Sequence, residues 1–396
     1  MDDELKPVAR HGALHPRHPW ALILRVLSLA LVTVLISGTS VAALVVWKLN
    51  ATIDKVSLVD EDAAQLTLSS IGSYDGGFNI LVVGSDTREG QGGGFGSESS
   101  ELNDVNLLVH VSEDHQNAVV VSLPRDLVVP IPSCPKEDGS GWYSSMSAQP
   151  INVALSYGGL ACAVLTVENL TGLDIPYAGL VTFKGVAQLA TAIGGVEVCV
   201  DGAIDDPYTG LKFPEAGTYS VEGYEALAFL RSRHGVGDGS DLGRISSQQL
   251  YMSSLVRKVQ DEGVLQDITK LYGIAQVAAS SMTLSNSLAG LDVMVAMALV
   301  LKEIPRENIV FVQYPGTTGV GGVYSGKVAP IESLATKLFD KIRNDTPFTL
   351  AEDATGVGSS AVDGESTTDP EVTDAPEQLD GVLGQTADQY TCAVAN

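Results

Sequence analysis

Arginine side chains are concentrated at a few places in a chain that is otherwise acidic. Arg231 and Arg233 lie within the five-residue stretch Leu-Arg-Ser-Arg-His, and Arg244 follows soon after. Arg88 and Arg125 each come shortly after an apolar run, where loops that follow strands commonly form binding sites. A guanidinium group presents a planar fork of N–H donors that matches two phosphate oxygens at once. The set therefore predicts a site for a strongly negative ligand such as a pyrophosphate.

A plainer interpretation is that each arginine only pairs with a neighbouring carboxylate. Arg125 is followed by Asp126, and Arg244 comes three residues after Asp241. Such pairs explain any single arginine well. They explain the whole set less well, because several arginines at strand and helix ends focus positive charge in an anionic protein.

Two aspartates accompany these arginines at similar positions. Asp86 follows one apolar run and Asp104 precedes another. A lone aspartate beside a strand is commonly a turn former. Next to a phosphate site, however, carboxylate oxygens are the ligands that magnesium prefers, and magnesium often bridges them to substrate phosphates. We therefore expect Mg²⁺ (or Mn²⁺) at Asp86 and Asp104.

The composition excludes several classes of function. The chain has 396 residues, 48 acidic and 23 basic, for a net charge of -25. Such a surface repels nucleic-acid phosphates, so we expect no nucleic-acid partner. A hydrophobic content of 45% supports a folded core and argues against a disordered chain. The four cysteines form no CxxC pair and have no histidine at zinc spacing, which argues against a structural zinc site.

An uncharged segment near the N-terminus predicts a membrane helix. Residues 26–47 contain no charge, and as a helix they would reach about 33 Å, enough to cross a hydrocarbon core. Four basic residues precede the segment, and Trp20 and Trp47 lie where interfacial aromatics belong. Residues 1–25 are then cytoplasmic and the remainder is extracellular. The alternative is a signal peptide cleaved near Ser40–Ala42, but the apolar run continues past that point. Outside the cell, the four cysteines are expected to form two disulfides.

The outer part divides by composition into three regions. Residues 48–75 are polar and acidic and predict a stalk with some helix, and residues 76–350 form the folded domain. Residues 351–396 hold ten acidic residues and no lysine or arginine, which predicts a largely disordered tail. Cys392 is unusual in such a tail, and a disulfide that tethers the tail to the domain explains it.

Strand and helix patterns alternate within the domain. Short apolar runs bounded by turn residues predict strands over 78–83, 105–111, 118–123, 195–200 and 308–313. Longer apolar patterns predict helices over 155–170, 183–192, 221–230, 246–262 and 288–302. The alternation predicts a layered α/β domain with helices on both faces of a sheet. Several helices are unusually apolar, so that some could line a groove for a lipid chain.

These segments, in this order, resemble the LytR-CpsA-Psr family of cell-wall glycopolymer ligases, in the type found in actinobacteria. The resemblance spans about 78–257, and its motifs are specific as a set. The matching stretches are Asn79–Arg88, Asn103–Val105, Ser122–Asp126, Ile151–Ala154, Val167–Gly172, Ile193–Val198, Ala226–Arg233 and Asp241–Gln249.

The resemblance implies a fold and an activity. The fold is a three-layer α/β/α sandwich with a mixed central sheet, preceded here by one transmembrane helix. The activity is a phosphotransferase reaction that moves a glycopolymer from a polyprenyl-pyrophosphate carrier to peptidoglycan, or to a cell-surface glycoprotein. By position, the metal ligands are Asp86 and Asp104, and the catalytic residues are Arg125, Arg231, Arg233 and Asp104. The pyrophosphate-binding residues implied are Arg88, Arg125, Arg231, Arg233, Arg244 and Gln248.

The chain departs from the family pattern at two positions. Many members carry arginine where this chain has Leu102, and a basic residue where it has Ser247. With one fewer contact to the phosphates, the chain is expected to differ from other members in its affinity for the ligand rather than in the class of reaction. The cysteines resemble those of actinobacterial members, which implies the pairs Cys134–Cys162 and Cys199–Cys392.

Two other functions fit the same residues. A non-catalytic protein that binds or senses the polyprenyl-phosphate lipid would use the same arginines and groove. A polyprenyl-pyrophosphate pyrophosphatase would use water in place of the acceptor hydroxyl. The candidates for the general base are Asp104 and Asp241.

Overall fold

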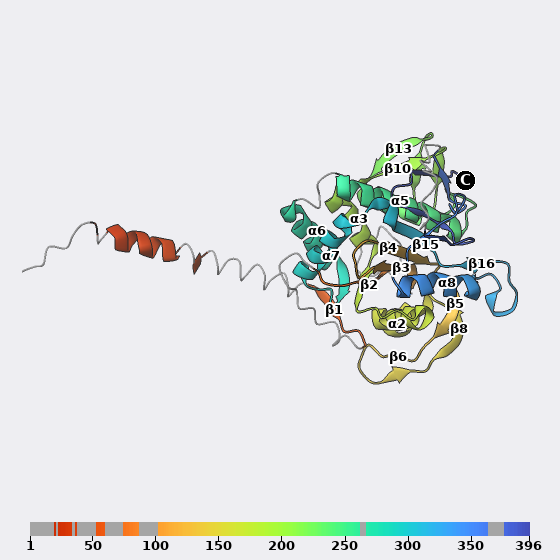
Figure 1. Cartoon of the computed structure of the whole chain (residues 1–396), viewed down its shortest axis with the longest axis horizontal. Helices are drawn as coiled ribbons and strands as arrows, with labels where there is room; N and C mark the ends of the chain where they lie inside the picture. The colour runs from red at the N-terminus through yellow and green to blue at the C-terminus, as the bar shows by residue number, and fades with distance from the viewer. Residues whose placement is uncertain are drawn as a thin grey trace, which may run out of the picture. The chain divides into compact units, whose positions relative to one another are not determined.

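The computed structural model describes residues 20, 23–33, 36–37, 53–59, 74–86, 102–261, 267–362 and 376–396. The chain divides into two units, Met1–Thr52 and Ile53–Asn396. In the first unit, Ile23–Thr33 form an apolar helix (Figure 1). The described residues of this helix are exposed. This helix is a candidate membrane span, and the predicted segment 26–47 lies partly outside the described residues. In the second unit one described helix is long and apolar enough to span a membrane, but it is mostly buried in the domain core.

The second unit is built on a mixed sheet of eight strands. Its order is β1 (Asp54–Val56), β14 (Met282–Ser285), β9 (Tyr177–Val181), β2 (Phe78–Ser85), β3 (Asn103–Val111), β4 (Ala118–Leu123), β15 (Ile309–Gln313) and β21 (Gly384–Thr386). The pair β2–β9 and the pair β4–β15 are parallel, whereas β3 is antiparallel to both of its neighbours. The predicted mixed α/β architecture is therefore present.

Helices pack against both faces of this sheet (Figure 1). On one face, α2 (Val153–Thr171) and α8 (Glu332–Arg343) pack against Leu81 and Leu108. On the other face lie α5 (Asp241–Asp261), α6 (Ile268–Ser281) and α7 (Leu291–Glu303). Helices α3 (Phe183–Ile193) and α4 (Gly223–Arg231) pack against each other, and α3 also contacts α6.

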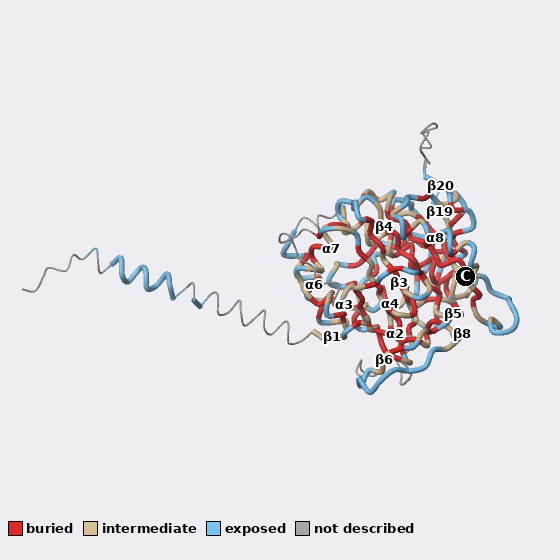
Figure 2. The backbone as a smooth tube through the Cα atoms, turned by 60° about the horizontal axis from the view of Figure 1, so that its bottom comes forward, coloured by how far each residue is buried: buried red, intermediate tan, exposed pale blue. Residues whose placement is uncertain are grey.

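The two faces of the sheet are covered to different degrees. Leu81, Val83 and Leu108, which face α2 and α8, are fully buried. Their neighbours Ile80 and Leu107, which face the α5–α7 helices, are only half-buried. Figure 2, which is coloured by the burial of each residue, shows both buried and half-buried residues within the domain. Apolar side chains between a sheet and its helices are normally close-packed, so this face retains uncovered apolar surface.

A second sheet contains part of the predicted tail. Its order is β13 (Gly217–Val221), β10 (Val196–Val200), β22 (Thr391–Ala393) and β19 (Ser359–Ala361). The predicted disulfide Cys199–Cys392 is present and joins the neighbouring strands β10 and β22. The prediction of a largely disordered tail is therefore wrong for 351–362 and 376–396. Half of the acidic residues of 351–396 fall within 363–375, which lie outside the described residues. The segments on either side carry apolar residues that pack into the domain.

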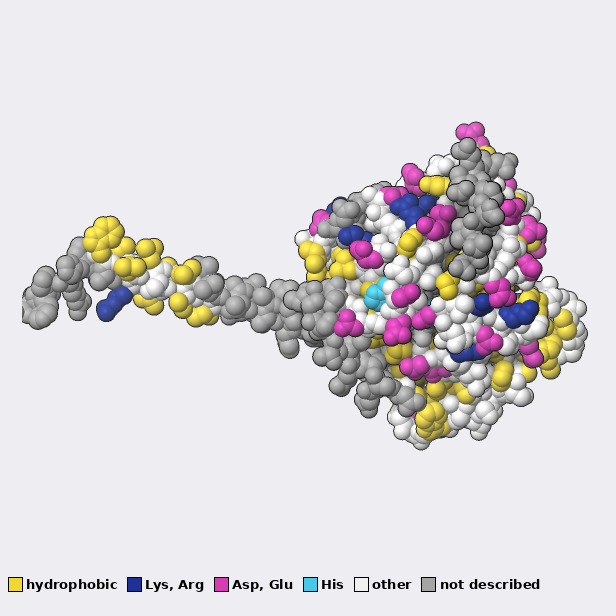
Figure 3. Space-filling view, in the orientation of Figure 1, with side chains coloured by type: hydrophobic (Ala, Val, Ile, Leu, Met, Phe, Trp, Pro, Cys, Tyr) yellow, Lys and Arg dark blue, Asp and Glu magenta, His cyan; other side chains and the backbone are white. Residues whose placement is uncertain are grey.

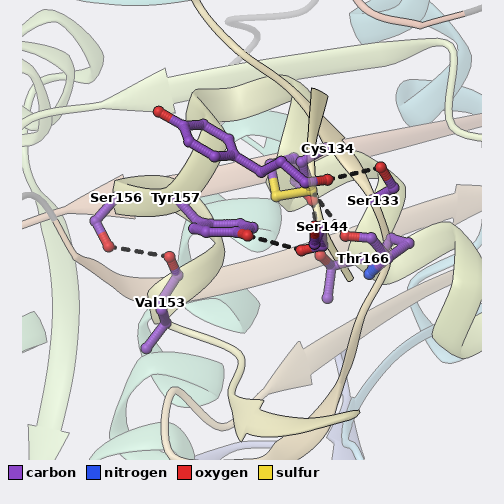
Figure 4. The surroundings of a disulfide bond; sticks show 10 residues. Ser133, Cys134, Ser144, Val153, Ser156, Tyr157 and Thr166 are labelled. Atoms are coloured by element: carbon purple, nitrogen blue, oxygen red, sulfur yellow. Dashed lines mark hydrogen bonds between the residues drawn. A yellow bond between two sulfur atoms is a disulfide. The ribbon is translucent and has the colours of Figure 1, made fainter. Parts of the chain in front are cut away.

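The other predicted disulfide, Cys134–Cys162, is also present and ties a hairpin to α2 (Figure 4). The hairpin consists of β6 (Cys134–Pro135) and β7 (Trp142–Tyr143), and the Tyr157 hydroxyl of α2 donates to the Ser144 carbonyl at 2.7 Å. Gly158 permits this close approach, because a Cβ there would lie only 3.0 Å from Cys162 Cβ and 3.1 Å from Cys134 Cβ. The helix is kinked at the same place.

The stalk prediction needs a second correction. Asp54–Val56 form an edge strand of the central sheet, parallel to β14, so this part of 48–75 belongs to the domain as a strand. The remaining short elements are β5 (Val128–Ile131), β8 (Met146–Pro150), β11 (Ile204–Asp206), β12 (Leu211–Phe213), η3 (Arg306–Asn308), β16 (Gly316–Thr317), η4 (Gly322–Tyr324), β17 (Ala329–Pro330), β18 (Phe348–Thr349) and β20 (Glu377–Gln378).

Candidate functional site

One edge of the central sheet gathers the ends of several strands. Strands β2, β4 and β15 end there, and the antiparallel β3 begins there. Asp86 follows β2, Asp104 lies at the start of β3, and Arg125 follows β4. The topology thus brings three of the predicted residues to the same edge.

A β-bulge lies at Asp104. Gly84 pairs with Val105, but Ser85 pairs with Asn103, so Asp104 is an extra residue on β3. Bulges leave one residue unpaired and redirect its side chain, and they occur often beside functional sites. Just beyond the bulge the Asp86 N–H donates to the Leu102 carbonyl at 3.0 Å, and the Leu102 N–H donates to Asp86 Oδ1 at 2.8 Å. These bonds hold Asp86 close to the start of β3.

Arg125 is fixed by the turn that follows β4. The Leu127 N–H closes this turn onto the Pro124 carbonyl at 2.9 Å, and the Asn152 N–H donates to the Arg125 carbonyl at 3.2 Å. The Arg125 side chain reaches back to β3, where Nη1 donates to Asp104 Oδ1 at 2.5 Å. Burial alone would lower the pKa of Arg125, but nearby carboxylates, Asp104 first among them, outweigh burial and raise it.

Arg233 comes from a turn that follows α4. A buried carboxylate, Asp206, organises this turn by accepting from the Ser232 hydroxyl at 2.7 Å and from the Arg233 N–H at 3.2 Å. Burial would raise the pKa of Asp206, but these hydrogen bonds favour the charged form and hold the pKa below its usual value. The anchored turn directs Arg233 Nη2 to within 3.1 Å of Asp241 Oδ1.

The first turn of α5 supplies the centre of the cluster. Asp241 Oδ1 lies 2.6 Å from Arg244 Nη2 and 3.9 Å from Arg125 Nε. Arg244 Nη2 also donates to the Asp104 carbonyl at 2.9 Å. Burial lowers the pKa of Arg244 to about 10, with Asp241 opposing and Arg233 reinforcing the shift. At neutral pH Arg244 therefore remains a cation, although only 4% of the residue is exposed.

The cluster has polar atoms without partners. Among the described residues, Nε of Arg125 and Nε of Arg244 are buried and have no hydrogen-bond acceptor. Both carboxylate oxygens of Asp241 likewise lack a hydrogen bond, because its short contacts with the arginines are not aligned as hydrogen bonds. Three guanidinium groups and two carboxylates are thus held close together with donor capacity unused. Such an arrangement suits an oxygen-rich anion.

The other predicted residues are placed differently. The Arg231 guanidinium lies over the Phe183 ring, 4.1 Å from its centre, and thus faces α3. Gln248 is buried and its side-chain amide donates to the Leu230 carbonyl at 2.8 Å, which links α5 to the end of α4. Arg88 lies outside the described residues. In the described part of the chain no group of three or more His, Cys, Asp or Glu side chains forms a metal cluster.

Sequence reasoning missed two contributors. Asp206 holds the Arg233 turn, and Lys327 pairs with Asp126 Oδ1 at 2.6 Å, one residue from Arg125. No local motif marks either residue, since each reaches the site from a distant part of the chain. The net charge does not point to Lys327 either. On the face of the molecule that Figure 3 shows, acidic side chains are scattered and basic ones are fewer.

The geometry and the motifs agree with a known family. A model of the LytR_cpsA_psr family matches residues 44–340, which is most of the chain. The chain belongs to the LytR_cpsA_psr family. The motif stretches on which the resemblance was based all lie within this match, and they include the residues of the arginine–aspartate cluster.

Curated relatives in the family include proteins named for cell-wall synthesis. The cell wall biosynthesis protein LcpA of Corynebacterium glutamicum is 30% identical over 284 residues, covering 65% of this chain and 54% of that protein. The polyisoprenyl-teichoic acid–peptidoglycan teichoic acid transferase TagT of Bacillus subtilis is 29% identical over 231 residues, covering 56% of this chain and 66% of TagT. The chain spans about half the length of the first of these relatives.

A solved structure in the same family supports the fold. The LytR-Csp2A-Psr enzyme from Actinomyces oris superposes with a TM-score of 0.52 at 20% identity, covering 73% of this chain and 96% of that chain. TagT bound to LIIa-WTA superposes with a TM-score of 0.51 at 19% identity, covering 73% of this chain and 98% of that one. At this identity the likeness concerns the fold.

Proposed function

We propose that this chain is a phosphotransferase of the cell envelope. It moves a phosphate-linked glycopolymer from a polyprenyl-pyrophosphate carrier to peptidoglycan, or to a cell-surface protein. The observation that carries this proposal is the pair of buried Nε–H groups on Arg125 and Arg244 that have no acceptor among the described residues. A buried donor left unpaired costs about 1–3 kcal/mol, which phosphate oxygens would recover. The relatives named as teichoic acid transferases support the same reaction class.

The uncovered face of the central sheet supports a lipid-linked donor. Ile80, Leu107 and Val109 are half-buried beneath α5 and α7. The charged cluster lies at the edge of the same sheet, where β3 begins and α5 starts. An apolar chain on this face would place its diphosphate at the arginines. The N-terminal apolar helix would hold the domain close to the membrane that supplies such a lipid.

The chemistry asked of these residues is mainly charge stabilisation. The acceptor hydroxyl forms a new P–O bond with the phosphorus that carries the glycan, and the bond from that phosphorus to the bridging oxygen breaks. Polyprenyl phosphate leaves with the electron pair, and the hydroxyl proton passes to a carboxylate, for which Asp104 and Asp241 are the candidates. Arg125, Arg233 and Arg244 stabilise the negative charge that accumulates on the phosphate oxygens. Arg88, Arg231 and Gln248 remain predicted contacts of the pyrophosphate.

We propose a divalent metal at two carboxylates, that of Asp86, which follows β2, and that of Asp104, at the start of β3. Asp86 is hydrogen-bonded to Leu102, two residues from Asp104, and Arg125 engages only one oxygen of Asp104. Magnesium commonly takes one or two protein carboxylates and completes its shell with phosphate oxygens and water. We therefore assign Asp86 and Asp104 as ligands of Mg²⁺ (or Mn²⁺). When bound, the metal would neutralise phosphate charge.

A transfer assay with the full-length chain in detergent micelles tests the proposal. The donor is a polyprenyl-pyrophosphate-linked oligosaccharide, the acceptor is a peptidoglycan oligomer, and Mg²⁺ is present. Mass spectrometry detects the phosphodiester-linked product. Arg125→Ala and Asp104→Ala are expected to lower its rate at least about 100-fold, the usual effect of removing one group that stabilises transition-state charge. Arg306→Ala is the matched control, because Arg306 is also partly exposed and paired with an aspartate, Asp261.

The outcomes separate the three functions. Product that disappears in both variants but persists in Arg306→Ala supports the transferase. Donor binding with no product from several donors favours a lipid-binding protein. Release of polyprenyl phosphate in the absence of acceptor, at the rate seen with acceptor, favours a pyrophosphatase.

A further inference from the structure

A hollow lies near the charged cluster, on the face of the central sheet that α2 and α8 cover. Its volume is about 380 Å³, within the usual range for small-ligand sites. Strand β5, the end of α2, helix α8 and the β16–β17 loop form its walls, on the side of the domain where α8, β5 and β16 lie in Figure 1. Its lining includes Tyr314, Tyr324, Phe339, Asn169, Glu332 and Arg343.

Tyr314 gives this hollow the character of a binding site. It directly follows β15, and only 3% of the residue is exposed. Its ring packs beside Phe339, with ring centres 5.9 Å apart, while its hydroxyl has no hydrogen-bond partner in the part of the chain that the structure describes. The hydroxyl oxygen is not among the fully buried unpaired polar atoms of the described residues, so it opens onto accessible space. Since Tyr314 lines the hollow, this hydroxyl can pair with a ligand there.

The hollow and the charged cluster share a wall. The Val328 N–H donates to the Asp126 carbonyl at 3.1 Å, and the Val128 N–H donates to the Val328 carbonyl at 3.0 Å. Val128 lines the hollow and lies three residues from Arg125, which is at most about 10 Å along an extended chain. A ligand a few sugar units long can therefore reach both places at once.

We propose that this hollow binds a sugar unit of the acceptor glycan, next to the hydroxyl that is phosphorylated. The chemistry of the lining selects a carbohydrate. Tyrosine and phenylalanine rings pack against the C–H faces of a sugar, and amide, carboxylate and hydroxyl groups such as Asn169, Glu332 and Tyr314 bind its hydroxyls. A lipid chain would leave these polar groups without partners. This assignment rests on the proposed function.

The position on the sheet selects the acceptor over the donor. Tyr314 and Phe339 belong to the core on the α2–α8 face, whereas the half-buried apolar side chains lie on the α5–α7 face. In phosphoryl transfer the incoming and leaving oxygens are roughly in line. A polyprenyl phosphate that leaves toward the α5–α7 face therefore calls for an acceptor that enters from the α2–α8 face, where the hollow lies.

The test separates binding of the acceptor from turnover. With the full-length chain in detergent micelles, initial rates are measured against the concentration of a soluble peptidoglycan glycan oligosaccharide. Tyr314→Phe removes only the unpartnered hydroxyl, and Tyr324→Ala removes a ring at the rim. Tyr314→Phe is expected to raise the acceptor KM about fivefold, the equivalent of one lost hydrogen bond, and Tyr324→Ala to raise it by a similar factor through the lost ring contact. In both variants kcat and the donor KM are expected to be unchanged. Val323→Ala is the control, because Val323 is 64% exposed on the same loop and is not part of the lining.

A direct measurement keeps this inference distinct from the proposed function. Saturation-transfer NMR reports binding of the same oligosaccharide without any donor. A signal that weakens in Tyr324→Ala but not in Val323→Ala supports the acceptor site even if no transfer occurs, in which case only the proposed function fails. Unchanged acceptor KM and unchanged NMR signals in both tyrosine variants overturn the inference. A rise in donor KM alone also overturns it, because the hollow would then hold the donor glycan.

Discussion

Replacement of Asp241 by asparagine tests whether this carboxylate holds the arginine cluster together. Asp241 Oδ1 lies 2.6 Å from Arg244 Nη2 and 3.1 Å from Arg233 Nη2, and the side chains of Asp241 and Arg244 are only 11% and 5% exposed. Asparagine keeps the shape and removes the charge, which leaves Arg244 buried with its main counter-ion lost. Breaking a buried pair in this way costs about 3–5 kcal/mol. We therefore expect Asp241→Asn to lower the free energy of unfolding by about 3 kcal/mol, at the lower end because asparagine still offers an acceptor oxygen.

Urea unfolding of the oxidised protein, followed by circular dichroism, measures this loss. Asp261→Asn is the control, because Asp261, at the end of α5, also pairs with an arginine, Arg306, but is 60% exposed, and exposed pairs contribute about 0–1 kcal/mol. Inorganic pyrophosphate is then added. Since its oxygens can take the place of the lost carboxylate, it should stabilise Asp241→Asn more than it stabilises the wild-type chain.

Two results would refute this reasoning. A loss below about 1 kcal/mol, as for an exposed pair, would mean that Asp241 is not the counter-ion of Arg244. Equal stabilisation of both proteins by pyrophosphate would mean that the anion does not bind at this cluster.

Three further predictions concern pH, disulfides and the arginine fork. Burial lowers the pKa of His110, although Asp345 opposes the shift. The contribution of His110 to stability is therefore complete above the unfolded pKa of about 6.5 and is lost as the pH falls below it. His110→Gln should flatten this pH dependence of the free energy of unfolding, measured by urea titration between about pH 5 and 7.5. Replacing Cys199 and Cys392 by alanine opens a loop of 193 residues. On the chain-entropy model this should lower the free energy of unfolding by about 5 kcal/mol, which is measured as a lower urea midpoint. An unchanged midpoint would show that strands β10 and β22 stay paired without the disulfide. Arg125→Lys keeps the positive charge but loses the pair of parallel N–H donors of the guanidinium group. The rate of transfer should therefore fall at least about tenfold, while circular dichroism shows an intact fold. A wild-type rate would show that the charge alone is sufficient.

The parts of the fold with apolar sequence signals could be predicted. Strands β3 and β4 were expected from short apolar runs at 105–111 and 118–123, and the structure has them at Asn103–Val111 and Ala118–Leu123. Helix α8 is absent from the predicted helices, although Leu338, Phe339 and Ile342 have helical spacing and are buried. The C-terminal strands could not be inferred from the average composition of 351–396. The acidic residues in the middle of this segment dominate the average, although apolar residues such as Leu379 and Val382 are buried.

The candidate site was predicted in its residue types and less well in its arrangement. Helix α5 was expected to begin near Ser246 but begins at Asp241, because its first turns bury polar side chains such as Arg244 and Ser247 that hydrophobic periodicity cannot detect. The predicted ion pair between Arg244 and Asp241 is present. The same arginine nevertheless keeps a buried Nε–H without an acceptor among the described residues. Only the three-dimensional arrangement shows that one carboxylate serves several arginines.

The placement of the segment 376–396 governs the order in which the domain can be assembled. Strand β21 completes the edge of the central sheet and β22 lies inside the second sheet, where the Ala387 and Gln389 carbonyls also accept from Arg257 of α5, both at 2.8 Å. Synthesis runs from the N-terminus, so Cys199 is made long before its partner Cys392. Until then the helix that carries Asp241 and Arg244 lacks its last supports. We therefore expect the charged cluster to reach its final arrangement only after residues up to about 393 have been made.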